Sequence, residues 1–300
     1  MLINVLMSTY NGEAYIYEQI HSILNQENVN TIVSVRDDGS QDNTADIIKK
    51  MMNDYPDRIK FYEGENLGYA RSFLELLKMA ENADYYAFAD QDDYWLPSKL
   101  SMAIECLGKI DNEVKLYTSS LTFCDENLKE LYINRMDKKR KTLKSDFIRH
   151  CYAGCTMVFS KKLRDIVSSF EFDRIVPSHD FVVSSVALSV GEVYVDPASY
   201  ILHRRSSNSV TSKGTGFIDR IKVERMVIHC NKYENSTMAK KLLTNDSVCR
   251  NLTGKNSKFL TAVASSKIVD RFRLIFDNQF TCGILICDLE SRYKILLGNY

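Results

Sequence analysis

Residues 85–95 read Tyr85-Tyr86-Ala87-Phe88-Ala89-Asp90-Gln91-Asp92-Asp93-Tyr94-Trp95. Apolar and aromatic residues with strand character lead directly into three carboxylates within four positions. Carboxylates this close repel one another, and at the end of a buried strand they need a compensating cation or hydrogen-bond donors. Because oxygen ligands suit Mg²⁺ or Mn²⁺, the run predicts a metal site at the end of a strand.

Two other interpretations of this run compete with the metal site. An Asp-rich turn after a strand stays open, because Asp is a common turn residue. A calcium loop of the EF-hand type requires Gly at its sixth position, and counting from Asp90 that position holds Trp95. The calcium loop is therefore excluded.

The chain before residue 85 repeats an order of strand, polar turn and helix. The expected strands are residues 2–7, 31–36 and 59–62, and a fourth unit continues from the acidic run into a helix through Ile110, with Pro97 in its first turn. This alternation predicts an α/β fold with a doubly wound, mostly parallel sheet. Ligands of such sheets gather at the carboxyl ends of the strands. We therefore expect the polar turns at residues 8–11, 37–40, 68–71 and 90–93 to converge in one crevice.

The second part of the chain is less regular. Strands are expected at 114–122 and 152–159, an apolar helix at 181–190 after Pro177-Ser178-His179-Asp180, and two short strands around Asp196-Pro197. Residues 125–144, which include Lys138-Lys139-Arg140-Lys141, are interpreted as a solvated loop, with contact to a phosphate-bearing lipid head group as the alternative. From Phe217 onward the apolar spacing is helical.

Composition narrows the class of protein. With 300 residues, 45% of them hydrophobic, 26% charged and four prolines, the chain has the composition of a soluble globular protein. Its formal net charge of zero argues against nucleic acid as a partner. Residues 217–300 carry 14 Lys and Arg against 8 Asp and Glu. This basic region leaves open peripheral contact with an anionic membrane surface, beside the commoner solvated helix face.

Cysteine usage and hydropathy indicate the compartment. The eight cysteines include no C-x-x-C pair, so reduced thiols in a cytosol fit best. The N-terminus Met1-Leu2-Ile3-Asn4-Val5 lacks the basic and apolar regions of a signal peptide, and no apolar run reaches the ~20 residues of a spanning helix. We expect a cytoplasmic protein, at most peripheral on the inner face of the cell membrane.

The motifs together resemble family 2 glycosyltransferases with the GT-A fold, in both order and spacing. The resemblance rests on Ser8-Thr9-Tyr10-Asn11 with Glu18-Gln19, Asp37-Asp38-Gly39-Ser40 with Asp42-Asn43-Thr44, Asn66-Leu67-Gly68 with Arg71, and Asp90-Gln91-Asp92-Asp93-Tyr94-Trp95. Further on, Gly154 to Phe159, His179-Asp180, and His203-Arg204-Arg205 with Asn208 and Val210 look like the bacterial rhamnosyltransferase-type branch, with Ser206 where that branch usually has a histidine. The resemblance covers roughly residues 1–215.

This resemblance implies a domain plan and a set of site residues. A catalytic domain would span residues 1–215, with a nucleotide-sugar half at about 1–110 and an acceptor half at about 111–215, followed by a helical extension at 216–300. Asp90 and Asp92 would hold the donor ribose and Mn²⁺ or Mg²⁺, with Asp92 favoured as the direct ligand. Asp180 matches the general base, with a helix-cap role as the alternative. The remaining donor-site residues would be Ser8, Thr9, Tyr10, Asn11, Asp38, Gly68, Arg71, His203 and Arg204, supported by Asp93, Trp95 and His179.

The resulting hypothesis is a metal-dependent, inverting glycosyltransferase. It would move a sugar, with dTDP-rhamnose favoured and a UDP-sugar open as the donor, to a bacterial cell-surface glycan, free or lipid-linked. Two other classes stay open, a nucleotidyltransferase that makes a sugar nucleotide and a non-catalytic module that binds sugar nucleotides or glycans. Homo-oligomerisation is also left open.

Overall fold

The structure is a computed structural model that describes residues 1–136, 141–173, 175–205 and 234–300. The chain forms two compact units. The first comprises Met1–Lys138, Tyr152–Ser169 and Ser178–Arg204, and the second comprises Lys139–Cys151, Phe170–Pro177 and Arg205–Tyr300. The predicted domain boundary at residue 215, the motif residues Asn208 and Val210, the cations at 138–140 and the start of the predicted helix at Phe217 lie outside the described residues.

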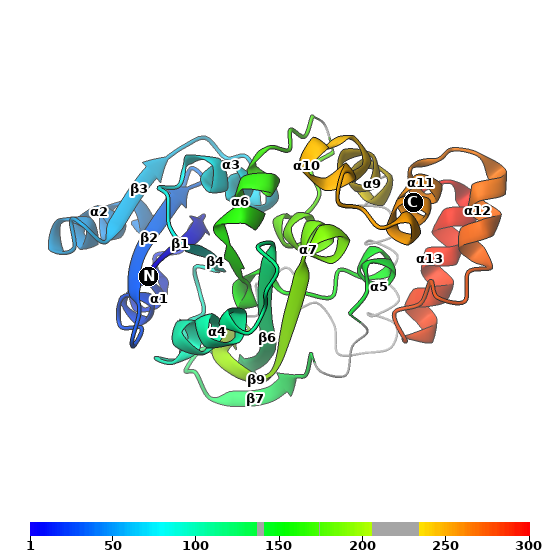
Figure 1. Cartoon of the computed structure of the whole chain (residues 1–300). Coiled ribbons are helices and arrows are strands. Elements are labelled where there is room, and N and C mark those ends of the chain that lie inside the picture. The colour runs from blue at the N-terminus through cyan, green and yellow to red at the C-terminus, as the bar shows by residue number, and fades with distance from the viewer. Residues whose placement is uncertain (137–140, 174, 206–233) are drawn as a thin grey trace. The chain divides into compact units, whose positions relative to one another are not determined.

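The first unit contains a sheet in the order β3-β2-β1-β4-β8-β6-β9-β5, with β7 paired to β6 (Figure 1). Four neighbouring strands are parallel, as the alternation of strands and helices predicted: β3 (Ile59–Glu63), β2 (Asn30–Asp37), β1 (Leu2–Thr9) and β4 (Tyr85–Ala89). The remaining strands are β8 (Val158–Ser160), β6 (Lys115–Cys124), β9 (Glu192–Arg204), β5 (Tyr94–Trp95) and β7 (Glu130–Asn134), of which β6 and β9 pair in parallel. The carboxyl ends of β1, β2 and β4 therefore share one edge of the sheet.

Both faces of the parallel strands are covered by helices, so the strands are nearly continuous in apolar residues. Alternate residues of β1, among them Val5 and Met7, belong to one core with buried residues of α1 (Ile16–Leu24), α2 (Thr44–Asp54) and α4 (Lys99–Gly108). On β4, Phe88 meets Phe73 of α3 (Tyr69–Met79) with ring centroids 5.3 Å apart. Helices α6 (Lys161–Ser168) and α7 (His179–Val190) contact α3 and one another. This packing holds the strand ends in place.

Several sequence expectations are corrected by the structure. Strand β9 is continuous, although two short strands were expected around Asp196-Pro197. The strand passes Pro197 through a bulge, because its register against β6 shifts there and leaves Pro197 and Ala198 without pairing partners. Proline is tolerated in such a bulge, since no ladder hydrogen bond is lost. The expected solvated loop contains strand β7, and a single turn of 3-10 helix, Gly154–Thr156, precedes the short β8. Helix α4 begins at Lys99 after the N-cap Ser98, so Pro97 precedes the helix.

The described part of the second unit is helical. Its helices are α5 (Leu143–Ile148), α9 (Glu234–Thr244), α10 (Asp246–Cys249), α11 (Gly254–Ala264), α12 (Ile268–Ile275) and α13 (Leu285–Leu297) (Figure 1). Aromatic rings form part of its core, where Phe147 lies edge-on to Phe259 at 5.4 Å and Phe280 lies edge-on to Tyr300 at 5.8 Å. Within the ranges that the structure describes, we find no helix with both the length and the apolar character required to cross a bilayer.

Candidate active site

The polar turns expected to converge are joined by hydrogen bonds. Tyr10 and Gln91, from the turns after β1 and β4, bond reciprocally: the Tyr10 N–H donates to Gln91 Oε1 at 2.8 Å, and Gln91 Nε2 donates to the Tyr10 carbonyl at 3.1 Å. The turns after β1 and β2 are joined in the same way. There the Asn11 N–H donates to Ser40 Oγ at 2.9 Å, and the Gln41 N–H donates to Asn11 Oδ1 at 2.8 Å. The three strand ends therefore form one connected surface.

Asp38 links the end of β2 to the start of α3. It is 2% exposed, and its carboxylate forms an ion pair with Arg36. The same carboxylate accepts from the N–H groups of Leu67 and Gly68, each at 2.9 Å. Sequence reasoning assigned no role to Arg36 and missed this one. Its position near the end of β2, two residues before Asp38, was the available signal, because residues i and i+2 of extended chain share a face.

The N-terminus of α3 completes this part of the surface. Gly68 is the N-cap residue with φ of 78°, and Arg71 lies half-buried in the first turn. Ser72 of the same turn receives a bond from Arg36 at 2.8 Å and shares one with Ser8, Oγ to Oγ, at 2.6 Å. A helix N-terminus favours negatively charged ligands, so this placement suits a diphosphate. Ser72 was not predicted from the sequence.

The acidic segment after β4 is held by α1 and β9. Gln19 Nε2 donates to the Asp90 carbonyl at 3.1 Å, and Arg204 donates to the Asp92 carbonyl at 2.8 Å. Arg204 is buried, pairs with Glu18, and stacks over the Tyr15 ring at 4.6 Å from its centroid. In this structure Arg204 positions the acidic segment, and its predicted contact with the donor diphosphate stays a prediction.

Asp93 and His203 form the centre of an acidic cluster. His203 Nδ1 lies 2.6 Å from Asp93 Oδ1, although the two residues are 110 positions apart. Asp93 is fully buried, and its Oδ2 has no hydrogen-bond partner within the described residues. Ligand atoms of Asp90, Asp93, Cys155 and His203 all lie within 4.8 Å of one another, and Asp92 is not part of this group.

The cluster is short of positive charge. Burial, followed by the negative charge of Asp93, raises the pKa of Asp90 to about 7 against the opposing effect of His203. The same two causes raise the pKa of Asp92. Burial would lower the pKa of His203, but the charge of Asp93 and their hydrogen bond outweigh it and raise that pKa to about 9. The carboxylates therefore lack sufficient compensation from the protein.

The chemistry of these residues fits a hard divalent cation. Carboxylate and imidazole groups are suitable ligands for Mn²⁺, and a cation beside the cluster would balance the negative charge of buried Asp93, whose Oδ2 has no partner in the described chain. Because Nδ1 of His203 faces Asp93, its Nε2 is the atom left for a metal, the arrangement in which a carboxylate orients a ligating histidine. Burial and the charges of Asp93 and Asp90 raise the pKa of the Cys155 thiol well above its usual value, so this sulfur stays protonated and is unsuited to a hard cation.

Trp95 lies in the core, where it is 1% exposed. Fully buried Lys99 places its Nζ 3.6 Å from the centroid of the Trp95 ring. This ammonium has no hydrogen-bond partner in the part of the chain that the structure describes, and burial lowers its pKa to about 7. Sequence reasoning did not single out Lys99, which interacts electrostatically with Cys155 and Asp93. Trp95 therefore supports the acidic segment by packing in the core next to it.

Asp180 lies in the first turn of α7. The N-cap position is occupied by Ser178, and the Asp180 carboxylate accepts from the N–H of the next residue, Phe181, at 2.8 Å. After burial and the charges of Asp93 and Asp92, the charge of Asp180 also contributes to the raised pKa of Asp90. Asp180 therefore lies near the acidic cluster and outside the N-cap position.

His179 packs beside this residue. Its ring is buried, stacks on Phe73 at 4.0 Å and lies edge-on to Phe88 at 4.8 Å. Neither ring nitrogen has a hydrogen-bond partner among the described residues, and burial lowers its pKa. A Cβ at Gly154 would come within 2.6 Å of His179 Nε2, so a larger residue there would displace the imidazole. These contacts support a packing role for His179 rather than orientation of Asp180 through a hydrogen bond.

Comparisons with known proteins agree with this architecture. A profile of the family described as "Glycosyl transferase family 2" matches residues 4–167. The dTDP-rhamnosyl transferase RfbG of Shigella flexneri is 30% identical, over 83% of this chain and 88% of the relative. The uncharacterized glycosyltransferase RT0329 of Rickettsia typhi is 24% identical, over 76% and 74% of the two chains.

Solved structures share the fold. Residues 1–349 of TarS from S. aureus, in complex with UDP-GlcNAc, align with a TM-score of 0.60 and 18% identity over 99% of this chain and 82% of that one. The mannosyltransferase PcManGT from Pyrobaculum calidifontis, in complex with GDP-Man and Mn²⁺, aligns with a TM-score of 0.52 and 15% identity over 99% and 88%. At these identities the likeness concerns the fold alone. The solved structures show the GT-A fold, and the matched profile together with the 30% identity to the Shigella flexneri enzyme shows that the chain belongs to glycosyltransferase family 2 and is similar to a bacterial rhamnosyltransferase.

Proposed function

We propose that this protein is an inverting glycosyltransferase that moves a sugar from a nucleoside diphosphate donor to a bacterial cell-surface glycan. The observation that carries the proposal is the joining of the polar turns of β1, β2 and β4 beside an acidic cluster, in a member of family 2. The name of the Shigella flexneri relative supports dTDP-rhamnose as the donor, with a UDP-sugar as the alternative. The catalytic domain is proposed to extend to about residue 215, and the protein to act in the cytoplasm.

The donor is proposed to bind along the joined turns. Ser8, Thr9, Tyr10 and Asn11 would line the nucleotide at the end of β1. Both oxygens of Asp38 already accept hydrogen bonds from the protein, and through them Asp38 holds Leu67 and Gly68 in position. We propose that Asp38 also contacts the base or the ribose of the donor. Arg71 and the N-terminus of α3 would face the negatively charged end of the donor.

Asp90, Asp92 and Nε2 of His203 are proposed to hold Mn²⁺ or Mg²⁺. Asp92 is preferred over Asp93, because Asp93 is fully buried and one of its oxygens is bonded to His203. Asp93 then orients the imidazole. When bound, the cation stabilises the negative charge of the departing diphosphate. The mannosyltransferase of similar fold was solved in complex with Mn²⁺, which supports this choice of ion.

Asp180 is proposed as the general base. Its carboxylate takes the proton of the acceptor hydroxyl as that oxygen attacks the anomeric carbon. The new glycosidic bond forms as the bond between the anomeric carbon and the diphosphate oxygen breaks on the opposite face, so the configuration inverts. The position of Asp180 at the start of α7, near enough to Asp90 to influence its pKa, supports this role.

The test is an activity panel with dTDP-rhamnose and UDP-sugars, Mn²⁺ and a set of glycan acceptors. We expect release of the nucleoside diphosphate together with a product of inverted configuration, assigned by NMR. Asp180→Asn should abolish transfer without loss of donor binding, whereas the surface variant Asp165→Asn should retain activity. Donor binding without transfer or hydrolysis would indicate a binding module, and a sugar nucleotide formed from sugar 1-phosphate and a nucleoside triphosphate would indicate a nucleotidyltransferase. Either result would overturn the proposal.

A further inference from the structure

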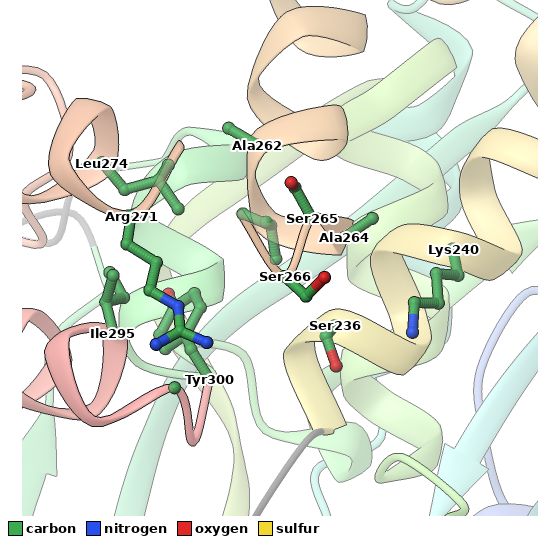
Figure 2. A pocket seen from close by; sticks show the side chains of 12 residues that line it. Ser236, Lys240, Ala262, Ala264, Ser265, Ser266, Arg271, Leu274, Ile295 and Tyr300 are labelled. Atoms are coloured by element: carbon green, nitrogen blue, oxygen red, sulfur yellow. The ribbon is translucent and has the colours of Figure 1, made fainter. Parts of the chain in front are cut away.

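The helical unit contains a pocket of about 150 Å³ formed by α9, α11, α12 and the end of α13. None of the twelve described residues that line it is Asp or Glu. Arg271 and Lys240 lie on opposite sides of the pocket, and Ser236 and Ser266 lie between them (Figure 2). The lining thus combines two cations with hydroxyl donors and lacks a carboxylate.

The guanidinium of Arg271 has no ion pair or hydrogen bond to any described residue. It packs against the C-terminal end of α13, where a Cβ added to Gly298 would come within 2.6 Å of Arg271 Nη2. The nearby carbonyls of Ile295 and Lys294 accept bonds from the N–H groups of Gly298 and Asn299. The donors of the guanidinium are therefore available to a ligand.

The second cation, Lys240, is exposed, and its Nζ has no partner in the described chain either. Three other cations of this unit do have acidic partners, since Lys144 pairs with Asp277, Arg273 with Asp270, and Lys294 with Glu290. Two unpaired cations that share one pocket repel each other, and an anion between them would remove that cost.

We propose that this pocket binds a phosphate group, as a site separate from the donor site. A guanidinium binds phosphate oxygens through two parallel hydrogen bonds, an ammonium supplies a point charge, and serine hydroxyls donate to further oxygens. A cavity of about 150 Å³ accommodates a molecule as large as benzene, so a phosphate group fits. The inference does not depend on the proposed transfer reaction.

Two kinds of ligand carry such a phosphate group: a soluble phosphate or diphosphate, and a lipid with a phosphate head group. A lipid is a candidate because α12 exposes three apolar side chains beside Arg271. The exposed fractions of Ile268, Val269 and Phe272 are 66%, 58% and 46%. Apolar side chains next to a cationic pocket are suited to an amphiphile that carries a phosphate.

The experiment uses the whole chain and two arms. In the first arm, calorimetry measures binding of inorganic phosphate and pyrophosphate at constant ionic strength. In the second, cosedimentation compares phosphatidylcholine vesicles with and without phosphatidic acid. Arg271→Met and Lys240→Met remove the pocket cations, and their matched controls are Arg273→Met and Lys241→Met, which lie outside this pocket on the same two helices.

In at least one arm we expect the wild type to bind and each pocket variant to bind about 10-fold more weakly, the loss typical of a charge-assisted hydrogen bond. The control variants should bind like the wild type. Binding in the soluble arm assigns a free phosphate, and binding only in the vesicle arm assigns a head group. Because Lys240 is exposed, its variant should keep the wild-type melting temperature and remain informative if Arg271→Met is less stable. Absence of binding in both arms, or equal weakening by the controls, would overturn the proposal.

Discussion

The turns after β1 and β2 and the acidic cluster after β4 occupy the same edge of one sheet and differ in how their polar groups are satisfied. In the turns, Asp38 has partners for both oxygens, and Asn11 bonds through its backbone and its side chain. In the acidic cluster, Asp93 Oδ2 has no hydrogen-bond partner among described residues, and the pKa of Asp90 is raised to about 7. Lys99 Nζ, which interacts with Asp93 electrostatically, also has no hydrogen-bond partner there. One region is therefore preformed, and the other requires a ligand to balance its charge.

This difference has an energetic reason. A buried polar group that lacks its hydrogen bond costs about 1–3 kcal/mol, and more when it is charged. The protein offsets that cost for Asp38 and Asn11 in the turns, where only the neutral hydroxyl of Thr9 is buried without a partner among the described residues, and it leaves the cost of charged groups uncompensated in and beside the acidic cluster. Substitutions in the turns should therefore change stability, and substitutions in the acidic cluster should change metal binding and catalysis.

The largest expected effect is on catalysis, from Asp92→Asn. If Asp92 is a direct metal ligand, this change should lower kcat/KM by about 10³-fold, a loss of about 4 kcal/mol in transition-state stabilisation. Transfer rates across a Mn²⁺ titration measure the loss, and circular dichroism checks the fold. If Asp93→Asn is the more damaging of the two variants, the direct ligand is Asp93.

Asp38→Ala should have the largest effect on stability. It leaves the buried guanidinium of Arg36 without its counter-ion, which costs about 3–5 kcal/mol. Urea unfolding measures the free energy, with Asp165→Asn as a surface control. The double variant Asp38→Ala, Arg36→Met should recover part of the loss, and an unchanged unfolding midpoint for the single variant would contradict a preformed turn.

Asp93→Asn tests whether Asp93 orients His203 for metal binding. Removal of a carboxylate that orients a metal-bound histidine typically costs about 10–100-fold in metal affinity or activity. We expect a loss in that range, with metal binding retained at higher Mn²⁺ concentration, as measured by isothermal titration. Wild-type affinity in this variant would show that the bond between Asp93 and His203 does not serve the metal site.

The stability of the metal-free protein should depend on pH through His203. Folding raises its pKa from 6.5 to about 9, so its contribution is complete below pH 6.5 and is lost as the pH rises through about 9. Lys99 acts in the opposite sense, because its lowered pKa of about 7 makes its contribution grow as the pH rises toward 10.5. The melting temperature of His203→Gln relative to wild type, measured in EDTA, isolates the histidine. The difference should be larger at pH 6 than at pH 9, and a constant difference would contradict the ion pair.

Gly68→Ala should have the smallest effect. At φ of 78° a Cβ costs about 1–2 kcal/mol, although no atom lies within 4 Å of the added carbon. Gly108→Ala is the matched control, since its site is equally open and its φ is not positive. Thermal unfolding should show a loss for residue 68 alone. Equal effects at both positions would remove the backbone argument for Gly68.

The sequence by itself determined the order of strands, polar turns and helices in the first 110 residues and the edge at which the turns gather. Those features follow from local periodicity and from the rule that parallel strands end on one side. It also indicated Asp90 and Asp92, because neighbouring carboxylates after a strand are visible as a local pattern.

Only the tertiary structure decided the partners of these residues. Asp93 meets His203 across 110 positions, Tyr10 meets Gln91 across 81, and Trp95 turns into the core beside Lys99. Such pairs depend on the register of strands and the docking of helices, and a shift of one residue in a strand exchanges the side chains on its two faces. The pattern of residues within one segment does not specify that register. The charge balance of the acidic cluster could therefore be determined only from the tertiary structure.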